Sequence, residues 1–202
     1  MFAIIQAVGW PIWPLLLASV IAVALIIERS VSLRRSRVVP GDLLNKVLAD
    51  LQQHGASGDM IARVASHSPL GRVLAAGLRN VNSSREVMKE SIEDCGRAVL
   101  HELERFLTTL GTIAAISPLL GLFGTIVGMI DIFASQGVGG ANPQQLAQGI
   151  SIALYTTGLG LIIAIPATIF WRHFRALIDS FVIDMEQQAI KLVEVVHGER
   201  RG

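Results

Sequence analysis

The segment 107–133 limits what this chain can fold into more than any other part of it. Asp131, near the far end of the segment, is its only ionisable residue. At 1.5 Å per residue, a helix of this length is longer than the roughly 30 Å thickness of the hydrocarbon core of a bilayer. We therefore expect 107–133 to form a membrane-spanning helix.

This expected span has one face of small residues. Gly121, Gly124, Thr125 and Gly128 are spaced three, four and seven residues apart, so they lie on one side of a helix, and large apolar residues cover most of the rest. A small, weakly polar face allows the backbone of another helix to approach closely. The pattern predicts that the span packs against other helices and that one of its faces is suited to line a passage.

Two further uncharged runs predict two more spans, one within residues 1–28 and one over 149–171. The second of these repeats the small face, at Gly149, Ala153, Thr156, Thr157, Gly160 and Ala164. Arginines follow each run: Arg29, Arg34, Arg35 and Arg37 after the first, Arg172 and Arg175 after the last. Because positive charge marks the cytoplasmic side, we expect the N-terminus outside and the C-terminus inside.

The remaining segments complete an all-α membrane protein with three transmembrane helices and long cytoplasmic helical extensions. We expect a cytoplasmic helical region at 29–106, a short periplasmic loop at 134–148 and a cytoplasmic C-terminal helix at 172–202. The composition agrees, since 51% of the residues are hydrophobic and 16% charged, against about a quarter charged in soluble domains.

Local signals give a finer prediction for the cytoplasmic region. Asp42 is expected to cap a helix, and Ser83 and Glu86 have the spacing of a capping box. No proline lies between Ser84 and the membrane, and apolar residues recur there every three or four positions. We therefore predict one continuous helix over about 84–133, with a kink where Pro118 interrupts it.

Residue types exclude several kinds of function. The five histidines are far apart, and the single cysteine, Cys95, allows neither an internal disulfide nor a cysteine-based metal site. The glycines of the second span do not follow a strand, so they are no nucleotide-binding loop. The net charge of +1 gives no reason to expect nucleic acid. We therefore expect that the chain is not an enzyme and binds neither a cofactor nor a metal ion.

Hydroxyl groups inside the membrane are the remaining chemistry. Thr125 lies about 12 Å below the outer end of its span, and Thr157 about 10 Å below the outer end of the third. One interpretation is that the threonines bond to backbone carbonyls and pack the helices. The other is that they line a polar passage together with Thr156 and Ser151, because a hydroxyl both donates and accepts hydrogen bonds.

Asp131 and the kink and packing residues complete the set of candidates. Asp131 is either an interfacial residue in contact with water or an outer site where ions enter. The packing and kink positions are Gly121, Gly124, Gly128, Gly160, Pro118 and Pro166. Since no carboxylate lies at mid-membrane, proton movement would need a titrating group from another chain.

Two motifs resemble the ExbB/TolQ/MotA proton-channel family: 117–129 is similar to its second-span motif, and 149–167 to its third-span motif. The size and the short uncharged N-terminus look most like ExbB. The resemblance implies a homopentamer in the bacterial inner membrane, with an ExbD-like single-span partner in the pore that carries a protonatable aspartate. It also implies a TonB-like partner, which passes the motion driven by proton flow to transporters of the outer membrane. Thr125 and Thr157 match the pore threonines of the family, and Pro166 matches its third-span proline.

One position departs from the family pattern. Many ExbB and TolQ proteins carry a glutamate early in the third span, where this chain has Ile152. The implied path would then use Thr125, Thr157, water and the aspartate of the partner. Three functions stay open: TonB-dependent import, a TolQ-like role in envelope constriction, and a non-conducting scaffold. The coupling ion is open between proton and sodium, and contact of the cytoplasmic arginines with membrane lipid remains an alternative to simple solvation.

Overall fold

A computed structural model describes residues 10–135 and 143–198 of the chain, and these residues form helices and turns without any strand. The helices are α2 (Ile12–Ser32), α3 (Arg35–Val38), α4 (Leu43–His54), α5 (Gly58–His67), α6 (Pro69–Arg79), α7 (Arg85–Leu103), α8 (Leu107–Ser135) and α9 (Pro143–Val196). The all-α prediction is confirmed. Of the expected loop at 134–148, residues 136–142 lie outside the described residues, while the structure has residues 134–135 in α8 and residues 143–148 in α9.

Among the residues that the structure describes, three segments are long and apolar enough to cross a membrane. They are Ile12–Ser32, a stretch within Arg85–Ala134 and a stretch within Gly149–Val196. These correspond to α2, to α8 and to the first part of α9. The prediction of three candidate spans is therefore confirmed by length and composition.

The chain divides into two compact units. The first contains Met1–Glu28 and Phe106–His173, and the second contains Arg29–Arg105 and Phe174–Gly202. The first unit carries most of the apolar helix length, and the second contains the short helices α3 to α7 together with the last part of α9.

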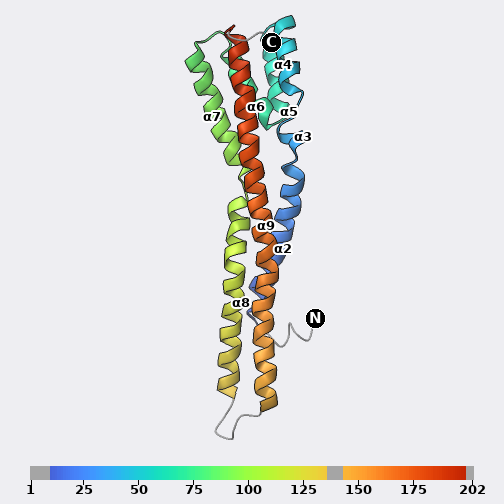
Figure 1. The fold of residues 1–202 in the computed structure, drawn as a ribbon, viewed down its shortest axis with the longest axis vertical. Coiled ribbons are helices and arrows are strands. Elements are labelled where there is room, and N and C mark those ends of the chain that lie inside the picture. The colour runs from blue at the N-terminus through green and yellow to red at the C-terminus, as the bar shows by residue number, and fades with distance from the viewer. Residues whose placement is uncertain (1–9, 136–142, 199–202) are drawn as a thin grey trace. The chain divides into compact units, whose positions relative to one another are not determined.

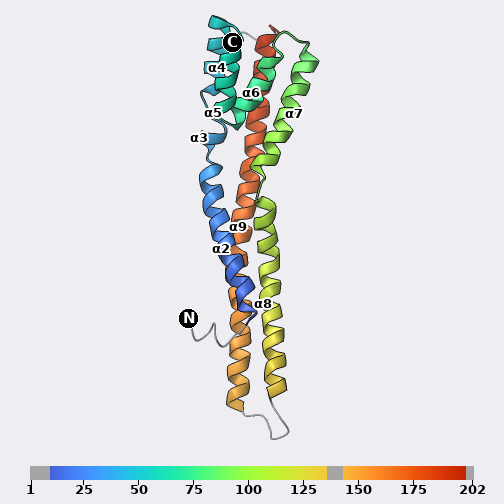
Figure 2. The ribbon, with the colours of Figure 1, turned by 180° about the vertical axis from the view of Figure 1, so that it is seen from behind.

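In the first unit, α8 and the adjoining part of α9 run side by side and antiparallel (Figures 1 and 2). Glycine contacts mark the pairing along its length. Gly111 faces Trp171, Gly128 faces Ala153 and Ile132 faces Gly149. At the start of α2, the ring of Trp10 packs edge-on against Phe123 of α8, with ring centroids 5.9 Å apart.

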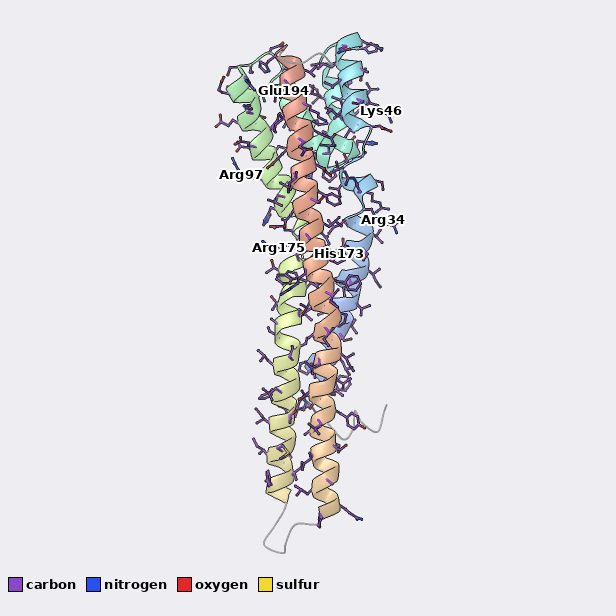
Figure 3. The ribbon with its side chains drawn as sticks, in the orientation of Figure 1. Arg34, Lys46, Arg97, His173, Arg175 and Glu194 are labelled. Carbon is purple, nitrogen blue, oxygen red and sulfur yellow. The ribbon has the colours of Figure 1, made fainter. Side chains whose placement is uncertain are left out.

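In the second unit, helical periodicity in the last part of α9 places a buried seam along that helix. This seam consists of Phe174, Ile178, Phe181, Met185 and Leu192. Charged side chains such as Lys46 on α4 and Arg97 on α7 lie exposed on the outside of the unit (Figure 3). The unit is thus a soluble-type helical assembly with an apolar interior.

Serine side chains cap three helices of the second unit. Ser57, Ser68 and Ser84 accept hydrogen bonds from the N–H groups of residues in the first turns of α5, α6 and α7. The predicted capping box at Ser83 is wrong by one residue, because Ser84 has the extended backbone that the cap position needs. Asp42 precedes α4 but has a helical backbone and makes no side-chain cap bond, so its predicted capping role is also wrong.

The predicted continuous helix over 84–133 is wrong. It is interrupted at residues 104–106, where Figure 1 shows the break between α7 and α8. Phe106 has a φ of 67°, a left-handed conformation that ends a right-handed helix. No proline or glycine at residues 101–110 signals this interruption. Arg29 donates from Nη1 to the carbonyl oxygen of Leu103, at 3.2 Å.

The prolines predicted to kink the second and third spans lie inside helices that continue through them, Pro118 in α8 and Pro166 in α9. Hydroxyl side chains lie close to each proline and bond to the backbone of the preceding turn. Ser117 donates to the carbonyl of Ile113 at 2.7 Å, and Thr168 donates to the carbonyl of Ala164 at 2.8 Å.

Candidate functional site

Two glycines, Gly121 of α8 and Gly160 of α9, face each other at the α8–α9 contact. A Cβ atom built on Gly121 would lie 2.8 Å from the carbonyl oxygen of Thr156 and 3.3 Å from the Cα of Gly160. A Cβ built on Gly160 would lie only 2.5 Å from the carbonyl oxygen of Ser117. These neighbours are backbone atoms that cannot rotate away, so this crossing requires glycine on both helices.

One turn further along α8, the side chain of Thr156 fills the space beside Gly124. A Cβ on Gly124 would lie 3.1 Å from the Cβ of Thr156. Thr156 is 1% exposed, and its hydroxyl donates to the carbonyl of Ala153 at 2.5 Å. Within the chain, Thr156 therefore lies inside the helix contact with its polar atom satisfied.

The close backbone approach brings the hydroxyls of Thr125 and Thr157 together. Their Oγ1 atoms are 2.6 Å apart, which is a short hydrogen bond between side chains on different spans. Each hydroxyl also lies near a carbonyl of the opposite helix. Thr125 Oγ1 is 3.0 Å from the carbonyl oxygen of Ala153, and Thr157 Oγ1 is 3.3 Å from that of Gly121.

This geometry admits two arrangements of the same two protons, since each hydroxyl has one proton to donate. In the first, Thr157 donates to Thr125, and Thr125 donates to the carbonyl of Ala153. In the second, Thr125 donates to Thr157, and Thr157 donates to the carbonyl of Gly121. Every donor is satisfied in both arrangements, so the direction of the hydrogen-bond chain can reverse without leaving a hydroxyl proton unbonded.

The hydroxyl pair is neither sealed nor fully exposed. Thr125 and Thr157 are both half-buried in the described chain, so one side of the pair remains accessible to water or to another side chain. No ionisable side chain belongs to this cluster in the part of α8 and α9 that the structure describes. The two hydroxyls can therefore donate and accept hydrogen bonds, but neither is ionised at neutral pH.

The structure does not bring every candidate residue to this cluster. Ser151 is exposed on α9 and lies about 160° around the helix from Ala153, at 100° per residue. Asp131 is exposed near the end of α8. Ile152 is half-buried on α9.

Sequence reasoning offered backbone carbonyls as acceptors for the threonine hydroxyls, but it missed that each hydroxyl also reaches a carbonyl of the opposite helix, Ala153 O for Thr125 and Gly121 O for Thr157. A usable signal exists, because threonine hydroxyls in helices commonly bond to the carbonyl four residues before them. Gly121 and Ala153 stand four residues before Thr125 and Thr157. Thr125 also follows the ordinary pattern, at 3.2 Å from Gly121 O. The exchange of these acceptors between helices depends on the register of α8 against α9, which one sequence does not give.

Comparison with known proteins places this arrangement in a family. The sequence model of the MotA/TolQ/ExbB proton channel family matches residues 65–187. The chain is 34% identical to an ExbB-like biopolymer transport protein of Synechocystis sp., over 86% of this chain and 85% of the relative. It is 32% identical to the biopolymer transport protein exbB1 of Vibrio cholerae, over 80% of this chain and 73% of the relative.

A further relative is named for a different system. The Tol-Pal system protein TolQ of Haemophilus influenzae is 27% identical, over 91% of this chain and 86% of the relative. The family match covers more than half of the chain and includes α8 together with most of α9, where the hydroxyl pair lies. The chain belongs to the MotA/TolQ/ExbB proton channel family.

Proposed function

We propose that this chain is the proton-channel subunit of an inner-membrane motor that energises TonB-dependent import through the outer membrane. The observation that carries the proposal is the 2.6 Å contact between Thr125 and Thr157. Two hydroxyls from different spans, each with an alternative carbonyl acceptor, form a hydrogen-bond chain that can reverse. Reversal is what proton transfer along such a chain requires.

The hydroxyl pair needs a titrating partner. A threonine hydroxyl donates and accepts hydrogen bonds but does not ionise near neutral pH, so a group that takes up and releases the proton must come from elsewhere. We infer that an ExbD-like protein supplies an aspartate from its single spanning helix. The accessible side of the half-buried pair would face that carboxyl group directly or through water.

The other candidates take different roles in this proposal. Thr156 serves helix packing, since its side chain is buried against Gly124. Ser151 lies on the far face of α9, so we leave it out of the path through the pair. Asp131, exposed near the end of α8, would help ions to enter from the periplasmic side.

The proposal includes a topology and an assembly. The N-terminus would lie in the periplasm and the C-terminus in the cytoplasm, because the arginines follow α2 and the membrane part of α9. The functional form would be a homo-oligomer, a pentamer by family resemblance, that surrounds the partner helices. Transport to the outer membrane would pass through a TonB-like protein.

Substitution of Thr157 tests the role of the hydroxyl. Thr157→Val keeps the shape but removes the donor, and we expect it to abolish proton flux in liposomes that contain the chain and its ExbD-like partner. Thr157→Ser restores a hydroxyl and should recover most of the flux. Intact assembly of both variants, measured by size-exclusion chromatography, is the control. Full flux in the valine variant would contradict the proposal.

A TolQ-like role in envelope constriction is the second candidate. The match to the Tol-Pal system protein over 91% of this chain supports it. Complementation separates the two, because a TonB-system subunit should restore energised import in cells that lack ExbB, while a TolQ-like subunit should restore envelope integrity in cells that lack TolQ. A scaffold without conduction would give no flux in liposomes with either partner.

A further inference from the structure

A second pair of polar groups lies on the same side of α8 and α9 as the hydroxyl pair. On α9, Thr168 comes eleven residues after Thr157, and on α8, Ala114 comes eleven residues before Thr125. Eleven residues make about three helical turns, so each step ends within roughly 20° of the starting face, about 16 Å along the axis. Because the two helices are antiparallel (Figures 1 and 2), both steps run toward the same end. Ala114 and Thr168 are therefore level with each other.

The contact between Gly111 and Trp171 supports this pairing of levels. Gly111 lies three residues beyond Ala114 in the same direction, and Trp171 lies three residues beyond Thr168. A Cβ built on Gly111 would lie 2.9 Å from Nε1 of Trp171. The two helices thus stay in register from the hydroxyl pair to one turn past Thr168.

The polar group at Ala114 is its backbone carbonyl. In a regular helix this carbonyl would accept the N–H of residue 118, but residue 118 is a proline inside α8 and has no N–H. The hydroxyl of Ser117 does not replace that donor, because it donates to the carbonyl of Ile113 at 2.7 Å. No other side chain of the described residues donates to the Ala114 carbonyl. Carbonyls that proline frees in membrane helices are satisfied by neighbouring side chains or by ordered water, so this one can accept from water.

The polar group on α9 is the hydroxyl of Thr168. Its proton is used within the helix, since Oγ1 donates to the carbonyl of Ala164 at 2.8 Å, but its oxygen can still accept a hydrogen bond. The side chain is half-buried, so part of it remains accessible. The Ala114 carbonyl and the Thr168 hydroxyl are therefore two acceptors at one depth, and both call for a donor from outside the helices.

We propose that the Ala114 carbonyl and the Thr168 hydroxyl hold a water molecule that receives the proton on the cytoplasmic side of the path. This water donates one hydrogen bond to each acceptor, which leaves its own lone pairs free to accept. When the protonated carboxyl group of the partner reaches the water, the O–H bond of the acid breaks and a new O–H bond to the water forms. The resulting hydronium ion then releases one proton to bulk water, and the carboxylate is ready to be protonated again.

The role of this water site in conduction rests on the proposed function, whereas its hydration does not. Arg172 follows Thr168 by four residues, about 6 Å along α9, so in the proposed topology the site lies close to cytoplasmic water. Between the two polar pairs, this side of the helices carries Pro118 on α8 and Leu161 on α9, which is 45% exposed. Because these side chains are apolar, the carboxyl group of the partner would carry the proton past them.

Thiol labelling tests the hydration without any need for proton flux. Cys95 is the only cysteine, so a Cys95→Ala chain carries a single thiol once Thr168→Cys is added. The complex with the partner is reconstituted in vesicles, and a charged, membrane-impermeant methanethiosulfonate is added on the cytoplasmic side. Ile169→Cys is the matched control, because Ile169 is exposed at nearly the same depth but lies about 100° further around α9. We expect the Thr168→Cys thiol to react about tenfold faster or more, since a hydrated thiol ionises more readily than one in lipid.

Proton flux in the same vesicles tests the role of the site. Thr168→Val removes the hydroxyl oxygen, and we expect about tenfold lower flux, the effect of one lost hydrogen bond to a charged group. Thr168→Ser should restore most of the flux. Thr112→Val is the control, because Thr112 makes the same kind of bond, to the carbonyl of Thr108 at 2.8 Å, but lies about 160° around α8 from Ala114. It should leave the flux unchanged.

Two results would overturn the water site. Equal labelling rates for Thr168→Cys and Ile169→Cys would show that the position is not hydrated, and full flux in Thr168→Val would show that the hydroxyl takes no part in conduction. If Thr157→Val also kept full flux, the hydroxyl pair itself would fail, but the labelling rates would still decide whether water reaches Thr168. Failure of this inference is thus distinguishable from failure of the proposed function.

Discussion

Substitution of Gly160 by alanine should pull the Thr125 and Thr157 hydroxyls apart, although the added methyl group would contact neither of them. The added Cβ would lie 2.5 Å from the carbonyl oxygen of Ser117 and 3.2 Å from the Cα of Gly121, and ordinary contact begins at 3.4 Å. The α8–α9 distance must therefore grow by as much as 0.9 Å, the difference between 3.4 and 2.5 Å. If the distance between the Thr125 and Thr157 hydroxyls grows by the same amount, their 2.6 Å bond lengthens to about 3.5 Å, which is beyond a normal O–H···O bond.

The cost in stability can be isolated with a neighbouring glycine. Gly158, on the same helix, has nothing within 4 Å of a built Cβ. Alanine at either position gains about 1 kcal/mol of helix propensity, so the difference between the two variants measures the steric term alone, about 1–3 kcal/mol. For a chain of this size, about 2 kcal/mol corresponds to roughly 4–8 °C in Tm.

The assay is thermal unfolding of both variants in the same detergent, followed by proton flux after reconstitution with the partner protein. Gly160→Ala should melt several degrees below Gly158→Ala and should conduct poorly. Equal melting temperatures for the two variants would refute the reasoning, because they would show that the helices do not approach as closely as the two glycines indicate.

Three further predictions concern the second unit. Gly71→Ala should destabilise the chain by about 3 kcal/mol or more, because the added Cβ would overlap the backbone carbonyl oxygen of Val64. Gly96→Ala is the control: its Cβ would meet nothing within 4 Å, so the variant should melt at the same temperature as the unmodified chain or higher. Burial raises the pKa of the Cys95 thiol, more than the nearby arginines lower it. Maleimide labelling of Cys95 should therefore be slow at neutral pH, and stability should fall as the pH rises above the pKa of the unfolded thiol, because the folded form holds the proton more tightly. The pKa of the Glu86 carboxyl is lowered, first by a hydrogen bond from its own backbone N–H and then by one from Ser84. The stabilisation that the ionised Glu86 gives should therefore be present above the pKa of the unfolded chain and lost as the pH falls through the folded pKa. Glu86→Gln should flatten that part of the curve of Tm against pH.

The spans and the small faces could be predicted from sequence because they depend on local properties. Apolar run length predicts a span, and the three-and-four spacing of Gly121, Gly124 and Thr125 predicts a face, whatever the helix packs against. The similar depth of Thr125 and Thr157 follows from counting residues along each helix. These are the parts of the candidate site that needed no knowledge of tertiary contacts.

The rest depended on contacts between distant residues. Thr156 and Thr157 are adjacent in sequence, yet one is buried against Gly124 and the other meets Thr125, because the register of α9 against α8 decides which face each occupies. The break at residues 104–106 was missed since the segment itself favours a helix. The bond from Arg29 to the carbonyl of Leu103, at the end of α7, also escapes sequence reasoning, because the two residues are 74 positions apart. From sequence alone, Arg29 indicated only which side of the membrane is cytoplasmic.

A double-variant cycle on proton flux tests the central claim most directly. The claim is that Thr125 and Thr157 act as one hydrogen-bonded unit in the proton path. Flux is measured for Thr125→Val, for Thr157→Val and for the double variant, each reconstituted with the partner protein at equal assembly. We predict that either single change lowers flux as much as both together, because residues that act as a unit are strongly non-additive. Independent, additive losses, or flux that persists in the double variant, would contradict the account.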